Sequence, residues 1–214
     1  MDNKVLFRDP AGSNVAQATI HRLVEQQAVV RSEAFAYLDG RRALTYRELN
    51  GRANAMARAL IGCGFKRGAV AVARMSPSAE LAIGLLAVLK TGGAYKLVDP
   101  ADTNYPKGFS TAELKGDDPC FRALDVMYVL EGDCPPSPNL PILTRGTDVA
   151  CVMPSVGGAP EVLVPHATIA ALQPNALLDD VEWAGESGAL DLWIALMTGA
   201  TVTVAEAPVE TVAA

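Results

Sequence analysis

A strand, a helix and a second strand follow one another with short connections in the first half of the chain, and this pattern most limits its possible folds. Residues 69–73 form a run of small and β-branched residues typical of a strand buried on both faces. Ser76 and Pro77 predict the start of the helix, with the serine as N-cap and the proline in the first turn. Gly92 predicts the end of the helix, and residues 94–98 form the next strand. We therefore expect an α/β fold with layered, parallel-rich sheets flanked by helices.

Apolar residues recur with helix or strand spacing on both sides of this unit, which predicts further helices and strands there. Thr45 and Glu48 have the spacing of a capping box, which predicts a helix from this point to Gly62. The proline-rich loop at 134–138 predicts a boundary between a first α/β subdomain at 1–134 and a partial second one at 139–214. Further helices are expected at 15–30, 167–172 and 189–197, and further strands at 34–38, 43–44, 126–130, 142–143, 149–153, 162–164 and 201–205.

Composition excludes several classes of protein. The formal net charge of −6 argues against binding to nucleic acid or to anionic membranes. The longest apolar run, at 81–89, is too short to cross a bilayer, and the N-terminus lacks a signal-peptide pattern, so we expect a cytoplasmic protein. The four cysteines have no metal-ligand or disulfide spacing and are expected to be reduced. His21 and His166 have no nucleophile or metal partners in the sequence, so we expect structural roles and no metal site.

Several segments then resemble the adenylation domains of nonribosomal peptide synthetases, which belong to the superfamily of acyl-CoA synthetases and luciferases. They are TIHRLVEQQA at 19–28, LTYRELN at 44–50 and LKTGGAYKLVDP at 89–100. Their order and spacing match the family over about a hundred residues. The resemblance implies the fold of the N-terminal subdomains of adenylate-forming enzymes, and in that family these motifs are mainly scaffold.

The family's phosphate-binding loop is the first motif in which this sequence departs from the pattern. The corresponding segment is 150–166, with Ser155, Gly157 and Gly158 as its remnant loop positions. The family's lysine position is occupied by Glu161. Such loops bind phosphate through backbone N–H groups and a lysine. A carboxylate about 4 Å from a phosphate costs on the order of 4 kcal/mol at an effective dielectric near 20, so we expect neither ATP nor Mg²⁺ to bind usefully. Alternatively, the two glycines form only a turn between strands.

A second remnant position is Glu186, which falls where the resemblance implies an aspartate that binds the amino group of the substrate. The alternative is that Glu186 and Ser187 only favour a helix N-terminus. The resemblance also implies a ribose-binding acid and a catalytic lysine in later parts of the family's domain, and these have no counterpart in the 214 residues.

The sequence therefore predicts a noncatalytic pseudo-adenylation protein with no catalytic residues of its own. We expect it to act as a structural or interaction component of nonribosomal peptide biosynthesis, with a synthetase module or a second copy of itself as partner. Two alternatives stay open: a module that binds an amino acid or nucleotide in a remnant pocket, and a fragment of an amino-acid-adenylating ligase completed by another chain.

Overall fold

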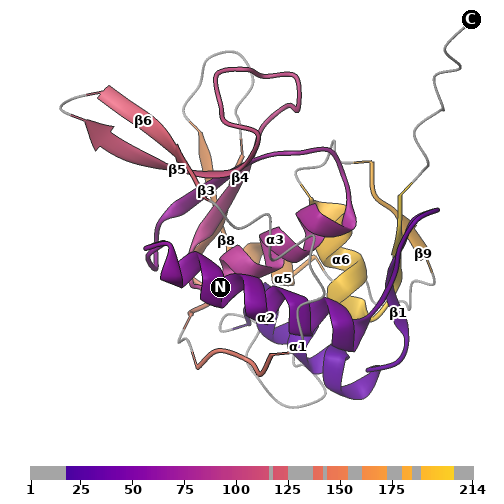
Figure 1. Ribbon diagram of the computed structural model, residues 1–214. Helices are drawn as coiled ribbons and strands as arrows, with labels where there is room; N and C mark the ends of the chain where they lie inside the picture. The colour runs from indigo at the N-terminus through magenta and orange to yellow at the C-terminus, as the bar shows by residue number, and fades with distance from the viewer. Residues whose placement is uncertain are drawn as a thin grey trace, which may run out of the picture.

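The computed structural model describes residues 18–115, 118–124, 137–141, 144–153, 161–172, 180–184 and 189–204, which form two β-sheets packed around helices (Figure 1). One sheet has the strand order β6-β5-β3-β4-β7-β8, and the other has the order β2-β1-β10-β9. The pairs β3–β4, β4–β7, β1–β10 and β10–β9 are parallel. The expected layered α/β fold with parallel-rich sheets is thus confirmed.

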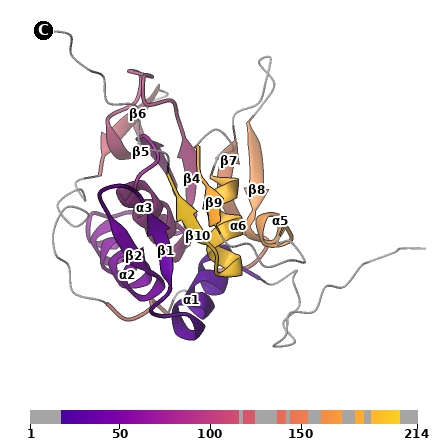
Figure 2. The same ribbon diagram turned by 90° about the vertical axis from the view of Figure 1, so that its right-hand side faces the viewer.

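The helices and strands have the following bounds. The helices are α1 Ile20–Val30, α2 Tyr46–Gly62, α3 Ala79–Lys90, α5 His166–Ala170 and α6 Leu190–Thr198. The strands are β1 Phe35–Leu38, β2 Ala43–Thr45, β3 Val70–Arg74, β4 Ala94–Leu97, β5 Gly108–Lys115, β6 Asp118–Ala123, β7 Val149–Met153, β8 Val162–Pro165, β9 Asp180–Glu182 and β10 Thr201–Thr203. Figures 1 and 2 show α3 and α6 between the two sheets and the β5–β6 hairpin extending away from the body.

The β3-α3-β4 unit forms as predicted, but its helix starts later than expected. Ser78, not Ser76, is the N-cap, and its hydroxyl accepts a hydrogen bond from the amide of Leu81 at 3.2 Å. Pro77 therefore lies before the cap and not in the first turn. The choice between two serines two residues apart depends on which one can reach an amide of the first turn, and sequence spacing alone did not distinguish them.

The capping box at the start of α2 is confirmed in full. The Thr45 hydroxyl accepts from the Glu48 amide at 3.2 Å, and the Glu48 carboxylate accepts from the Thr45 amide at 2.8 Å. These hydrogen bonds and the nearby Arg52 and Arg47 lower the pKa of Glu48 below its ordinary value. The first turn of α2 is therefore stabilised by two reciprocal bonds.

The sequence missed three strands. β5 and β6 form a hairpin on β3, and β9 pairs with β10. The strands predicted at 126–130 and 142–143 lie outside the described residues. Each sheet combines strands from both sides of the 134–139 segment, since β4 pairs with β7 and β1 with β10. The boundary between two subdomains stays a prediction.

One core connects these layers. Every residue of α3 except Glu80 is buried, and Gly84 lies so close to the Phe109 ring that an added Cβ would be 2.0 Å from its Cζ atom. Among the described residues, neither Cys63 nor Cys151 takes part in a disulfide, and nothing is described of the Cys120 and Cys134 side chains. Among the described residues, none of the helices combines the length and apolar character needed to cross a membrane.

Candidate functional site

The carboxyl ends of β3, β4 and β7 lie next to one another in the six-stranded sheet and open into a cavity of about 540 Å³. Ligands of open α/β sheets bind at this end of the strands, because the strand ends and their loops leave a crevice there. The lining is mainly apolar and includes residues from all three strand ends and from the segment after β9. The lining residues are Met75, Pro77, Leu81, Tyr95, Leu97, Val98, Asp99, Pro100, Cys151, Val152, Met153, Trp183 and Ala184.

Besides Asp99, three polar groups accompany this apolar lining. Trp183 is 1% exposed, and its indole Nε1 has no hydrogen-bond partner among the described residues. Tyr95 accepts a hydrogen bond from Trp193 Nε1 at 2.7 Å and is hydrogen-bonded to the Cys151 thiol. Burial raises the pKa of Cys151 and, to a greater extent, that of Tyr95. The thiol is therefore protonated and a poor nucleophile.

The predicted site residues are only partly within the described structure. Ser155, Gly157, Gly158 and Glu186 lie outside it, so their predicted roles stay predictions. The cavity is lined by Met153 and Ala184. Met153 is the last described residue before the segment that contains Ser155, Gly157 and Gly158, and Ala184 is the last one before the segment that contains Glu186.

Glu161, which directly precedes β8, is described, and it forms an ion pair. Its carboxylate lies 2.6 Å from Lys96 Nζ, and its side chain is 51% exposed. Lys96 also lies 3.2 Å from the Tyr105 hydroxyl and 5.2 Å from the centre of the Tyr105 ring. Partial burial lowers the pKa of Lys96, but the hydrogen bonds with Glu161 and Tyr105 outweigh that effect and raise it above its ordinary value. Lys96 was not among the predicted site residues, although a lysine within the otherwise apolar strand at 94–98 was an available signal.

The two histidines are buried side by side. His21 is 3% exposed and His166 is 0% exposed, and their ring centroids are 5.5 Å apart. Across the part of the chain that the structure describes, no group of three or more His, Cys, Asp or Glu side chains could hold a metal ion.

Comparison with known proteins shows which proteins this chain is similar to. Residues 24–113 match the family described as "AMP-binding enzyme". Tyrocidine synthase 3 of Brevibacillus parabrevis is 35% identical over 184 residues, which are 76% of this chain and 3% of that protein. Bacitracin synthase 1 of Bacillus licheniformis is 28% identical over 227 residues, 94% of this chain and 4% of that protein.

Among solved structures, the chain superimposes on the N-terminal subdomain of Klebsiella oxytoca NpsA in complex with anthranilyl-AMSN. The TM-score is 0.72 with 23% identity, and the match covers 88% of this chain and 55% of that one. An artificially fused adenylation and PCP di-domain containing NpsA matches with the same TM-score of 0.72 and 22% identity, over 88% of this chain and 40% of that one. The chain thus spans a few per cent of the curated relatives and about half of the solved chains.

Proposed function

The chain corresponds to part of the N-terminal subdomain of an adenylation domain of the AMP-binding family, as found in nonribosomal peptide synthetases, and from this premise we propose that it is a noncatalytic member. Its role is structural: it acts as an interaction component in the biosynthesis of a nonribosomal peptide. The parent family consists of ATP-dependent ligases, so the proposal is that this chain keeps their scaffold without their chemistry.

The ion pair between Lys96 and Glu161 carries this proposal. Glu161 stands where the family resemblance implies a phosphate-binding lysine, so a negative charge replaces a positive one. Lys96, which lies nearby on β4, is held by that same carboxylate at 2.6 Å. A lysine paired in this way has little attraction left for a phosphate, because the field of the carboxylate cancels much of its charge.

The loss of the lysine's positive charge is the reason that ATP, and with it the Mg²⁺ of the MgATP complex, is proposed not to bind usefully. Adenylation develops negative charge at the α-phosphate, which enzymes stabilise with cationic groups or metal ions. An unpaired carboxylate about 4 Å from a phosphate costs on the order of 4 kcal/mol at an effective dielectric near 20. The pairing with Lys96 reduces this repulsion, so the lost attraction of the family's lysine carries more of the proposed effect.

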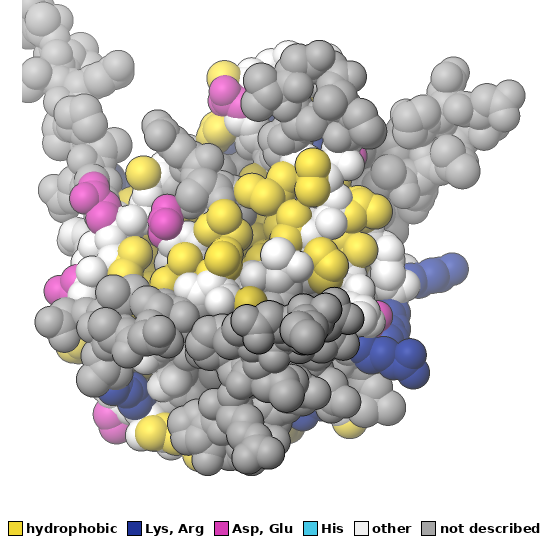
Figure 3. Space-filling view, turned by 180° about the vertical axis from the view of Figure 1, so that it is seen from behind, with side chains coloured by type: hydrophobic (Ala, Val, Ile, Leu, Met, Phe, Trp, Pro, Cys, Tyr) yellow, Lys and Arg dark blue, Asp and Glu magenta, His cyan; other side chains and the backbone are white. Residues whose placement is uncertain are grey.

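An apolar face supports a role in binding a protein partner. β7, β8 and α5 lie on the back of the molecule, and Figure 3 shows that a broad group of hydrophobic side chains occupies the centre of this side. Val162 and Leu163 of β8 are 52% and 61% exposed. Large exposed apolar areas commonly mark interfaces. The proposed partner is a synthetase module or a second copy of the chain.

An amino-acid-dependent pyrophosphate-exchange assay tests the loss of catalysis. We expect background rates with every amino acid, both for the chain alone and after addition of purified synthetase modules from its host. Exchange that appears only with a second chain would support a ligase completed in trans. Exchange by the chain alone would refute the noncatalytic proposal.

The cavity favours a second candidate, a module that binds a small molecule. Its volume of about 540 Å³ falls within the range of ligand pockets. Trp183 lines this cavity, and its indole N–H, which has no partner among the described residues, offers a hydrogen bond to an acceptor on a ligand. Calorimetric titrations with AMP and a panel of amino acids test this candidate. Titrations without saturable heat at millimolar ligand would refute the proposal of a small-molecule-binding module.

A further inference from the structure

The first backbone amide of α1 is capped by a side chain from a distant part of the chain. Thr19 occupies the N-cap position but makes no side-chain capping bond. The Ile20 N–H instead donates to Nδ1 of His166, the first residue of α5, at 3.3 Å. An unpaired N–H at a buried helix start is costly, so this contact fixes the start of α1 against α5.

The contact requires one protonation state of His166. Nδ1 can accept a hydrogen bond only when it carries a lone pair, so the ring must be neutral with its proton on Nε2. Protonation would place a second N–H against the Ile20 amide and a positive charge at the positive end of the α1 dipole.

His21 makes protonation still less favourable. Its ring meets that of His166 edge to face, with an interplanar angle of 78°. Neither Nδ1 of His21 nor Nε2 of His166 has a partner among the described residues, and both atoms are buried. A charged imidazole in either position would therefore lie buried without a described counter-ion bonded to these atoms.

The charged groups around His21 and His166 do not compensate for a buried positive charge on either ring. α1 contributes Arg22 and Glu25, but Glu25 is engaged by Lys90 of α3. Asp148, which precedes β7, is bound to Arg67 at 2.8 Å. α6 carries a single charged residue, Asp191. α5 has no charge other than His166 itself, and β8 has none.

We propose that His21 and His166 form an acid-sensitive latch, which holds the start of α1 on α5 while both rings are neutral and releases it when they are protonated. The latch is independent of adenylation chemistry and of the cavity. Its moving part is the first turn of α1, whose docking depends on the Ile20 to His166 bond.

The direction of the pH effect follows from burial. Burial, together with His166, Lys90 and Arg22, lowers the pKa of His21 well below its ordinary value. Burial also lowers the pKa of His166 to about 4, although Asp148 acts in the opposite direction. Because the folded-state pKa values lie below the unfolded value near 6.5, the latch is fully stable above that pH and weakens as pH falls towards 4. Protonation of His166 shifts the equilibrium between the docked and the released first turn of α1 towards the released form by on the order of a hundredfold or more.

Amide hydrogen exchange, corrected for intrinsic rates, tests the latch at pH 7 and pH 4.5. In the wild-type chain we expect the first-turn amides of α1, starting with Ile20, to lose at least tenfold in protection at the lower pH, while amides in the middle of α2 keep theirs. In the double variant His21→Asn and His166→Asn neither side chain can titrate, while the side-chain oxygen at position 166 can still accept from the Ile20 amide, so this loss should disappear. The same loss in the variant would overturn the proposal.

A second measurement needs no variant. The ¹⁵N shifts of the imidazole nitrogens in the folded wild-type chain should show His166 with a bare Nδ1 and a protonated Nε2 at pH 7. They should also show protonation of the ring over the same pH interval in which α1 loses protection. A proton on Nδ1 at pH 7, or a titration separate from the loss of protection, would contradict the latch even if the double variant fails to fold.

Discussion

The indole Nε1 of Trp193 donates a hydrogen bond to the hydroxyl of Tyr95 at 2.7 Å, although the two residues are 98 positions apart. Both side chains are fully buried, and their rings are 6.0 Å apart at 46°. The bond joins β4, in the centre of one sheet, to α6, which leads into β10 of the other sheet. The two sheets of this chain are therefore joined through a core that combines early and late parts of its sequence.

Replacing Tyr95 with phenylalanine should show how much this hydrogen bond contributes to the free energy of unfolding. Tyr95→Phe leaves the buried Trp193 N–H without its acceptor, which costs about 1–3 kcal/mol in the free energy of unfolding. Urea denaturation of Tyr95→Phe, Trp193→Phe and the double variant would give the coupling energy between the two side chains. Additive effects would show that the bond contributes nothing beyond packing.

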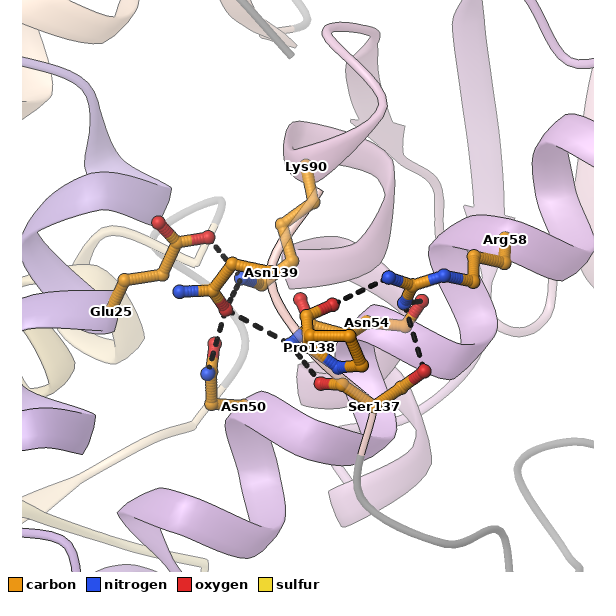
Figure 4. Close-up of polar contacts among 8 residues, drawn as sticks. All are labelled: Glu25, Asn50, Asn54, Arg58, Lys90, Ser137, Pro138 and Asn139. Atoms are coloured by element: carbon orange, nitrogen blue, oxygen red, sulfur yellow. Dashed lines mark hydrogen bonds and ion pairs between the residues drawn. The ribbon is translucent and has the colours of Figure 1, made fainter. Parts of the chain in front are cut away.

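The buried ion pair between Lys90 and Glu25 should be sensitive to the loss of one partner. Lys90 is 1% exposed, and Figure 4 shows its ammonium group reaching the Glu25 carboxylate beside Asn139. Burial lowers the pKa of Lys90, while Glu25 opposes this effect. Lys90→Met should cost about 3–5 kcal/mol because it leaves a carboxylate unpaired in a mostly buried position.

The control for this prediction is an exposed pair of the same type. Arg47 and Glu33 also form an ion pair, at 2.8 Å, but their side chains are 60% and 66% exposed. Arg47→Ala should change stability by no more than about 1 kcal/mol. Adding Glu25→Leu to Lys90→Met should recover much of the loss in urea denaturation, and equal effects of Lys90→Met and Arg47→Ala would contradict this account.

Gly84 offers a test in which two effects have opposite signs. Helix propensity alone predicts that Gly84→Ala stabilises α3 by about 1 kcal/mol. An added Cβ would meet the buried Phe109 ring at 2.0 Å, and overpacking of this kind costs about 1–3 kcal/mol. We expect a net loss in thermal stability, relieved by Phe109→Leu. Gly62→Ala, whose Cβ would meet nothing within 4 Å, should not destabilise the chain.

The capping box at the start of α2 predicts both a mutational and a pH effect. Thr45→Ala removes the acceptor for the Glu48 amide and should cost about 1 kcal/mol, whereas Thr45→Asp should largely preserve stability. Because the pKa of Glu48 is depressed in the folded state, its contribution is present above the unfolded pKa and is lost as pH falls through the folded value. The gap between the stability curves of Thr45→Ala and the wild type should therefore narrow in acid by the contribution of the bond from the Thr45 hydroxyl to the Glu48 carboxylate, while the loss of the bond to the Glu48 amide remains.

The sequence predicted well those helices and strands that are marked by local signals. Caps, glycine stops and apolar periodicity located α2, α3, β3 and β4, because each of these depends on neighbours a few residues away. The β5–β6 hairpin was missed, since strand preference depends on cross-strand packing and β5 contains a helix-compatible Ala-Glu-Leu-Lys segment. The Gly116-Asp117 pair between the two strands was a turn signal that could have revealed the hairpin.

The candidate site was harder to predict because its contacts are distant in sequence. Lys96 and Glu161 are 65 positions apart, and no local pattern indicates that their side chains meet. The same holds for the Ile20 amide and His166, which are 146 positions apart. The assignment of the family's lysine position to Glu161 stays a prediction, and only the fold showed that Lys96 pairs with this carboxylate.

Titration calorimetry of MgATP into the wild-type chain and Glu161→Lys tests the central claim most directly. The account predicts no saturable heat for the wild type at millimolar nucleotide. Glu161→Lys should bind MgATP measurably more tightly, because that change removes the carboxylate that pairs with Lys96 and adds a second cation. Saturable micromolar binding by the wild type, unchanged or weakened in Glu161→Lys, would contradict it.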